Sequence, residues 1–168
     1  MTYDVNKDLV NGNDVFLYLF TPSSAITAAS SFTSANTNVL AFATSCSLQI
    51  DGETIDSSNK MSCRWNSNLA GKNSYTVSAD ALYTAKEGAY SFDKLLELQV
   101  AGNAIGWAMA QPASDGDTVC ENNTFSIDNT QVIAWGYGLL TSLSLEAGND
   151  EIASCSTTLT GSGEIHTN

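Results

Sequence analysis

Basic residues and histidine are scarce in this sequence, and their scarcity argues against several classes of function. Lys and Arg number 6 against 18 Asp and Glu in 168 residues, which gives a net charge of −12. Nucleic-acid affinity comes mainly from cations that release counterions from phosphates, so the chain lacks the basic footprint of a nucleic-acid binder. The one histidine, His166, lies near the C-terminal end. Histidine-based catalytic triads and multi-histidine metal sites are therefore not expected.

Cysteine pairs and long apolar runs are also missing. Cys46, Cys63, Cys120 and Cys155 are scattered, with no C-x-x-C pair, so we expect free thiols rather than disulfides or zinc ligands. No apolar run approaches the ~20 residues of a membrane helix, and the first residues show no signal-peptide pattern. We expect a protein made in a cytosol, with no membrane segment, no catalytic residue, no metal and no cofactor.

The residues that are present predict a globular protein with an unusual surface. The apolar share is 43% and the charged share only 14%, and the length predicts one domain, 1–168, with a real core. Ser, Thr, Asn and Ala replace the missing charges, which suits a surface largely covered by other protein. Residues 95–168 contain nine acidic residues and neither Lys nor Arg.

Alternation of polar and apolar residues with period two is the main pattern, and it predicts strands with one buried face. In the segment 74–84, for example, Tyr75, Val77 and Ala79 share one face, whereas Thr76 and Ser78 share the other. A turn at 147–150 joins the last two strands as a hairpin. The expected strands are 15–20, 39–50, 74–84, 105–111, 124–127, 131–146 and 152–165.

One helix is predicted, over residues 92–101. Ser91 stands at the N-cap position and Gly102 just past the end. Its apolar stripe, which is expected to dock on a sheet, consists of Leu95, Leu96, Leu98 and Val100. Many antiparallel strands and one helix predict a mainly β fold: a two-sheet antiparallel β-sandwich or barrel with one packed α-helix.

Two stretches are expected to be loops. Residues 22–38 are rich in Ser, Thr and Ala. After a turn signal at Asp51-Gly52, the polar stretch up to residue 73 predicts an extended loop. This stretch holds half of the cations of the chain together with an aromatic residue, namely Lys60, Arg64, Lys72 and Trp65.

A succession of phrases in the sequence resembles the major tail tube proteins of long-tailed bacteriophages. The resemblance rests on the order and approximate spacing of these phrases rather than on any single phrase. Segments 21–38 and 112–123 have no counterpart in it. The phrases are LAFATSCSL (40–48), ETIDSS (53–58), YTVSADALY (75–83), YSFDKLLEL (90–98), LTSLSL (140–145) and STTLTGSGEI (156–165).

The resemblance implies a structural protein of the virion, synthesised in the cytoplasm of a bacterial host. It implies hexameric rings that stack into a tube, the conduit for DNA ejection, and a loop (51–73) that reaches a neighbouring protomer. The partners are then other copies of the chain, with tail terminator, tail tip and tape-measure proteins. DNA passes through the lumen without specific binding.

In such a tube one face of each inner-wall strand points at the lumen. Alternation then predicts a lumen-facing set that is rich in hydroxyls, with Asp80 and Glu146 as acids and no cation. Carboxylates repel DNA, whereas a cationic wall would bind its phosphates. The predicted set is Ser45, Ser47, Gln49, Thr76, Ser78, Asp80, Ser142, Ser144 and Glu146.

Two alternatives belong to other classes of function. A β-sandwich binding, decoration or adhesin module would be monomeric and would expose a loop patch rich in aromatic residues. An enzyme would need a cluster of acid and base groups with perturbed pKa values, and the sequence shows none. The tube subunit is the leading hypothesis.

Overall fold

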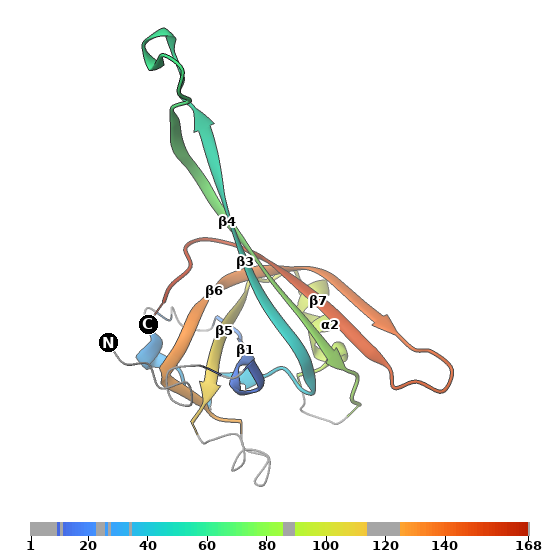
Figure 1. Cartoon of the computed structure of the whole chain (residues 1–168). Coiled ribbons are helices and arrows are strands. Elements are labelled where there is room, and N and C mark those ends of the chain that lie inside the picture. The colour runs from blue at the N-terminus through green and yellow to red at the C-terminus, as the bar shows by residue number, and fades with distance from the viewer. Residues whose placement is uncertain are drawn as a thin grey trace.

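The computed structural model describes residues 10, 12–22, 26, 28–33, 35–85, 90–113 and 125–167. Its strands form one antiparallel sheet in the order β2-β1-β5-β6-β7-β4-β3, and the helix α2 packs beside it (Figure 1). Three short 3-10 helices accompany them, η1 (Gly12–Asp14), η2 (Ala29–Ser31) and η3 (Lys60–Ser62). The elements are β1 (Phe16–Phe20), β2 (Asn38–Val39), β3 (Ala43–Asp56), β4 (Asn68–Leu82), α2 (Phe92–Ala101), β5 (Ile105–Pro112), β6 (Ile127–Glu146) and β7 (Ser154–Gly161).

The mainly β fold with one α-helix among the described residues is confirmed. The two expected sheets are joined into one, because the long strand β6 belongs to both halves. Its first part, up to Gly138, pairs with β5, and its second part, from Gly138 to Glu146, pairs with β7. A strand of this length curves through both layers, so a sandwich is built from a single hydrogen-bonded sheet.

The two edges of the sheet are brought together by a sharp turn. The single strand predicted at 39–50 is wrong, because the chain breaks at 40–42 and passes from β2 at one edge to β3 at the other. Phe42 takes a positive φ of 53° there, and its side chain is 62% exposed instead of buried. The thiol of Cys46 on β3 lies 3.8 Å from the carbonyl oxygen of Val15 beside β1. The sheet therefore curls towards a closed barrel.

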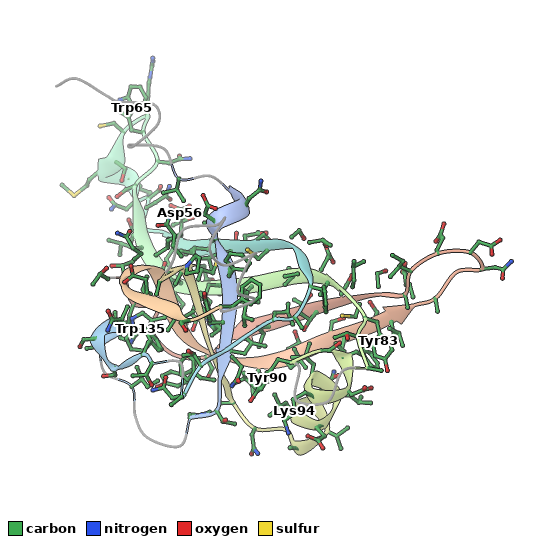
Figure 2. The ribbon with its side chains drawn as sticks, turned by 90° about the horizontal axis from the view of Figure 1, so that it is seen from below. Asp56, Trp65, Tyr83, Tyr90, Lys94 and Trp135 are labelled. Carbon is green, nitrogen blue, oxygen red and sulfur yellow. The ribbon has the colours of Figure 1, made fainter. Side chains whose placement is uncertain are left out.

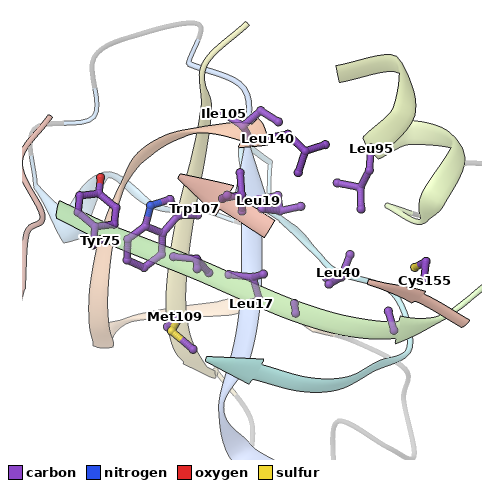
Figure 3. Packing of buried hydrophobic residues seen from close by; sticks show 14 of the residues in the cluster. Leu17, Leu19, Leu40, Tyr75, Leu95, Ile105, Trp107, Met109, Leu140 and Cys155 are labelled. Atoms are coloured by element: carbon purple, nitrogen blue, oxygen red, sulfur yellow. The ribbon is translucent and has the colours of Figure 1, made fainter. Parts of the chain in front are cut away.

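The main core fills the space inside this curl. Leu17 and Leu19 of β1, Val77 of β4 and Trp107 of β5 are fully buried there (Figure 3). The intervening residues of β1 and β5 point to the opposite face, where they are buried as well. Burial on both faces explains why these two strands read as continuous apolar runs rather than as alternating ones.

The second buried face is covered by a segment that the sequence predicts to be a loop. Within 22–38, Ile26, Ala29 and Phe32 are buried, and η2 lies among them. The Phe32 ring packs edge-on against Trp135, and the Ile26 amide donates to the Tyr137 hydroxyl at 3.1 Å. A few apolar side chains, spaced among Ser and Thr, are enough to anchor this cover on the sheet.

Helix α2 has the predicted bounds, but its ends and faces differ in detail. Gly102 follows in the left-handed conformation, as predicted. The Ser91 hydroxyl makes no cap bond to the helix and instead accepts from the Thr84 amide. Leu95 is buried, whereas Leu96 and Val100 are exposed, so the docked stripe is narrower than predicted.

Gly106 on β5 offers a test of packing in the second buried face. A methyl group added there would overlap the Phe20 ring. Gly106→Ala is expected to lower the free energy of unfolding by about 1–3 kcal/mol, as overpacking usually does. Gly12→Ala is the matched control, because an added methyl group meets nothing within 4 Å there. Urea unfolding of both variants measures the effect, and equal stabilities would contradict the packing described.

Candidate functional site

An extended polar surface covers one face of the four adjacent strands β3, β4, β7 and β6. Their register aligns the polar side chains in cross-strand rows. One row runs Ser45–Asp80–Ser156–Ser144, and the next runs Ser47–Ser78–Thr158–Ser142. The structure thus brings the predicted lumen-facing residues of three separate segments onto one surface. We call this surface the polar face; it consists of Ser45, Ser47, Gln49, Thr76, Ser78, Asp80, Ser142, Ser144 and Glu146, with Ser156, Thr158 and Thr160.

The last three of these residues lie on β7 and were missed by the sequence reasoning, although their strand was predicted. Each alternates with a buried neighbour, Cys155, Thr157 or Leu159. That alternation is the signal that could have found them. In the sheet, β7 lies between β4 and β6. Its hydroxyls therefore connect the polar side chains of β3 and β4 with those of β6.

Asp80 is fixed in the first row by two hydrogen bonds. The Ser156 hydroxyl donates to one carboxylate oxygen at 2.7 Å, and the Ser45 hydroxyl donates to the other at 2.8 Å. These two bonds, of which the one from Ser156 has the larger effect, hold the pKa of the Asp80 carboxyl below its ordinary value. Glu146 ends β6 at the margin of the same face and is exposed. The segments 43–50, 74–82, 139–146 and 154–161 contain neither Lys nor Arg, so the face carries negative charge only.

Ser156→Ala is expected to raise the pKa of Asp80 towards the ordinary value for Asp. With the lowered pKa, this carboxylate stabilises the folded state above the ordinary Asp pKa, and that contribution is lost as the pH falls through the lowered pKa. Removal of the Ser156 bond should therefore make the stability of the folded state depend less on pH between the lowered pKa of Asp80 and the ordinary pKa of Asp. Carboxyl-carbon NMR titration measures the pKa, with Ser144→Ala as control. An unchanged pKa in Ser156→Ala would contradict the geometry.

The predicted loop 51–73 is a β-ribbon rather than a loop over most of its length. Strand β3 continues to Asp56 and β4 begins at Asn68, with Ile55 paired to Leu69. The ribbon projects far from the rest of the molecule (Figure 1). The sequence-based boundary was wrong because the hydrophobic alternation stops where the core ends, whereas backbone pairing continues without it. We call residues 51–73 the arm and residues 57–67 its tip.

The tip is ordered by its own hydrogen bonds. Two bonds cap η3: the Met61 amide donates to Asn59 Oδ1 at 2.8 Å, and the Asn59 amide donates to Ser62 Oγ at 3.1 Å. The Ser57 hydroxyl donates to the Ser67 carbonyl at 3.0 Å and closes the base of the tip. Large apolar side chains beside this frame are exposed, since Met61 is 91% exposed and Trp65 is 83% exposed. Figure 2 shows Trp65 at the far end of the arm.

The cations of the arm form no ion pair with any residue in the described part of the protomer. Lys60 and Arg64 lie exposed on the tip, and Lys72 lies exposed on β4. Among the described residues the one ion pair is Lys94–Glu97 on α2. These three exposed cations on a strongly acidic protein, together with the exposed apolar side chains of the tip, make the arm a candidate surface for contact with another molecule.

The described part of the chain contains no cluster of side chains suited to a metal ion. No group of three His, Cys, Asp or Glu side chains is arranged there for a metal ion. Cys46, Cys63 and Cys155 are free, whereas Cys120 lies outside the described residues. His166 stacks on Trp135, with ring centroids 4.3 Å apart, which is a packing role. None of the helices that the structure describes has the length and apolar character needed to cross a membrane.

The comparisons with known proteins agree on one family. A family model described as phage tail tube protein matches residues 9–167. No curated protein sequence matches at a significant level. Among solved structures, a chain in the tail of an empty gene transfer agent particle, refined with helical and C6 symmetry, has a TM-score of 0.67 at 15% identity, covering 95% of this chain and 99% of that one. A chain of the SPP1 tail tube has a TM-score of 0.64 at 10% identity, covering 95% and 80%.

Proposed function

The chain belongs to the phage tail tube protein family, and from that premise we propose that its copies assemble into hexameric rings that stack into the tail tube of a virion. The whole chain is one tail-tube domain, and its role is structural rather than enzymatic. The similar chain from a gene transfer agent tail, refined with C6 symmetry, supports the sixfold ring. Head-to-tail contacts close a ring when the rotation allows it, and stacked rings form a helical tube.

The polar face is the observation that carries this proposal. A surface made of hydroxyls, one amide and two carboxylates covers one face of β3, β4, β7 and β6, while the alternate residues of β4 and β7, such as Val77 and Leu159, belong to the core. When protomers join around an axis, these faces form the wall of a lumen. Sheet edges that a lone domain leaves open are then covered by neighbours.

The proposed wall suits the passage of DNA without binding it. Asp80 and Glu146 repel phosphates, and each ring repeats them around the lumen. Three hydroxyls of this face are engaged within the protomer, because Ser45 and Ser156 donate to the Asp80 carboxylate and Ser47 donates to the Ser78 carbonyl at 3.5 Å. The wall offers a nucleic acid no cation, so strong affinity for its phosphates does not arise.

The arm supplies the contact between protomers. Its exposed Trp65 acts as an apolar anchor, since buried aromatic residues often dominate the energy of an interface. Lys60, Arg64 and Lys72 add charge that the acidic surface of another copy complements. The tube then ends on tail terminator and tail tip proteins and encloses a tape-measure protein. The protomer is synthesised in the cytoplasm of the bacterial host before it joins the virion.

Electron microscopy of the concentrated purified protein tests this function. Tubes or rings with sixfold symmetry are expected. Dispersed monomers at the same concentration would overturn the proposal and would favour a monomeric β-sandwich binding or adhesin module. Gel filtration of the same sample at a series of falling concentrations distinguishes rings from monomers. It also shows the protein concentration below which rings do not form.

A further inference from the structure

Two projections lie at opposite ends of the four-stranded sheet. The arm extends β3 and β4 beyond the pair Ile50–Tyr75. The β6–β7 hairpin, residues 147–153, lies beyond the pairs Leu82–Ser154 and Glu146–Ser154, at the opposite end of the sheet. Figure 1 shows the two projections pointing away from each other. In a head-to-tail stack, the arm end of one protomer therefore faces the hairpin end of the next.

The two projections have opposite charge. The tip of the arm contains Lys60 and Arg64 and no acidic residue. The hairpin contains Asp150 and Glu151 and no basic residue, and both acids are exposed. Among the residues that the structure describes, none of the four takes part in an ion pair. Each projection therefore presents a charge that no described residue of its own protomer neutralises.

Each projection also exposes apolar side chains beside its charges. The tip presents Met61 and Trp65, and the hairpin presents Ile152, which is 72% exposed. Leu145 at the end of β6 is exposed as well. A small apolar centre with charges around it is the usual composition of a specific protein interface.

We propose that the tip of the arm docks on the β6–β7 hairpin of a second copy of this chain in the adjacent ring. This inference rests on the proposed tube function and names the surface that receives the arm. Lys60 and Arg64 face Asp150 and Glu151 of the other copy. The apolar side chains of the tip cover Ile152.

The same pairing gives the tube a direction. Two tips that meet bring cations together, and two hairpins that meet bring carboxylates together, so both arrangements are repulsive. Of the three possible contacts, only the one between a tip and a hairpin brings opposite charges together. Rings therefore add in one orientation, and a tube with a head and a tail results from charges that each protomer carries.

Native Cys63, which is exposed on the tip, allows a direct test by cross-linking. In Glu151→Cys, mild oxidation of assembled tubes is expected to join protomers into disulfide-linked ladders on a non-reducing gel. Cys63→Ser in the same variant should abolish the ladder. Glu97→Cys, on the exposed side of α2, is the matched control and should give none. Tubes of Glu151→Cys that cross-link no more than those of Glu97→Cys would overturn the docking and leave the tube function standing.

A charge exchange tests the same contact without cysteine. Arg64→Glu and Glu151→Lys, each alone, are expected to reduce the yield of tubes by about tenfold or more, because the effect repeats around each ring. The double variant should recover to near the unaltered yield. No recovery, with circular dichroism showing folded protomers, would contradict the pairing. Failure of the unaltered protein to form tubes would instead contradict the proposed function.

Discussion

Protomers in which both cations of the arm tip are reversed, by Lys60→Glu with Arg64→Glu, are expected to fold normally and to fail to stack into tubes. Both side chains are exposed on the tip, so the stability of the protomer should not change. At about 0.5 kcal/mol for each exposed pair, two pairs in every protomer of a hexameric ring contribute about 6 kcal/mol to stacking. Their loss weakens the association of rings by roughly 10⁴-fold.

Sedimentation and electron microscopy measure the assembly, and circular dichroism measures the fold. Lys94→Glu is the matched control, because it reverses a cation on α2 that already pairs with Glu97 within the protomer. That variant is expected to assemble. Long tubes formed by the doubly reversed tip at ordinary salt would show that the arm makes no electrostatic contact between rings. High salt should weaken assembly of the unaltered protein for the same reason.

Particles whose tubes carry Asp80→Lys with Glu146→Lys are expected to assemble but to eject DNA slowly or not at all. Both residues are exposed on the polar face, so the protomer tolerates the change. Each ring then changes by roughly 24 units of charge and presents cations to a duplex with one charge per ~1.7 Å. Because six to ten phosphate contacts change affinity by about 10³–10⁵ between low and moderate salt, the block should be relieved as salt rises.

Ejection into liposomes or into solution, followed with a DNA-binding dye, gives the rate. Asp80→Asn with Glu146→Gln keeps the shape of the wall and removes its charge, and it should slow ejection far less. Glu97→Lys places a cation on α2, which packs on the core side of the sheet, and should have no effect. Normal ejection by the doubly cationic particles would rule out a lumen-facing position for these two residues.

Alternation in the sequence was a good guide wherever a strand is buried on one face. It placed Thr76, Ser78 and Asp80 opposite Val77 and Ala79, and the structure keeps that division. It failed where the environment changes along a strand. Phe42 alternates correctly with its neighbours but lies in the turn that carries the chain between sheet edges. Ile55 and Leu69 pair in a ribbon that has no core to impose a pattern.

The sequence by itself determined the strand-rich fold, the position of the helix, the deficit of cations and the concentration of those few cations around residues 60–72. These properties follow from local patterning and composition, which need no knowledge of distant contacts. Only the tertiary structure decided that β2 and β3 are opposite edges of one curled sheet and that β7 joins two polar patches into a single face. It also placed the arm, on β3 and β4, and the acidic hairpin, on β6 and β7, at opposite ends of the four-stranded part of the sheet. Pairing between distant segments is fixed by the closing of the sheet around a shared core, and no local pattern records it.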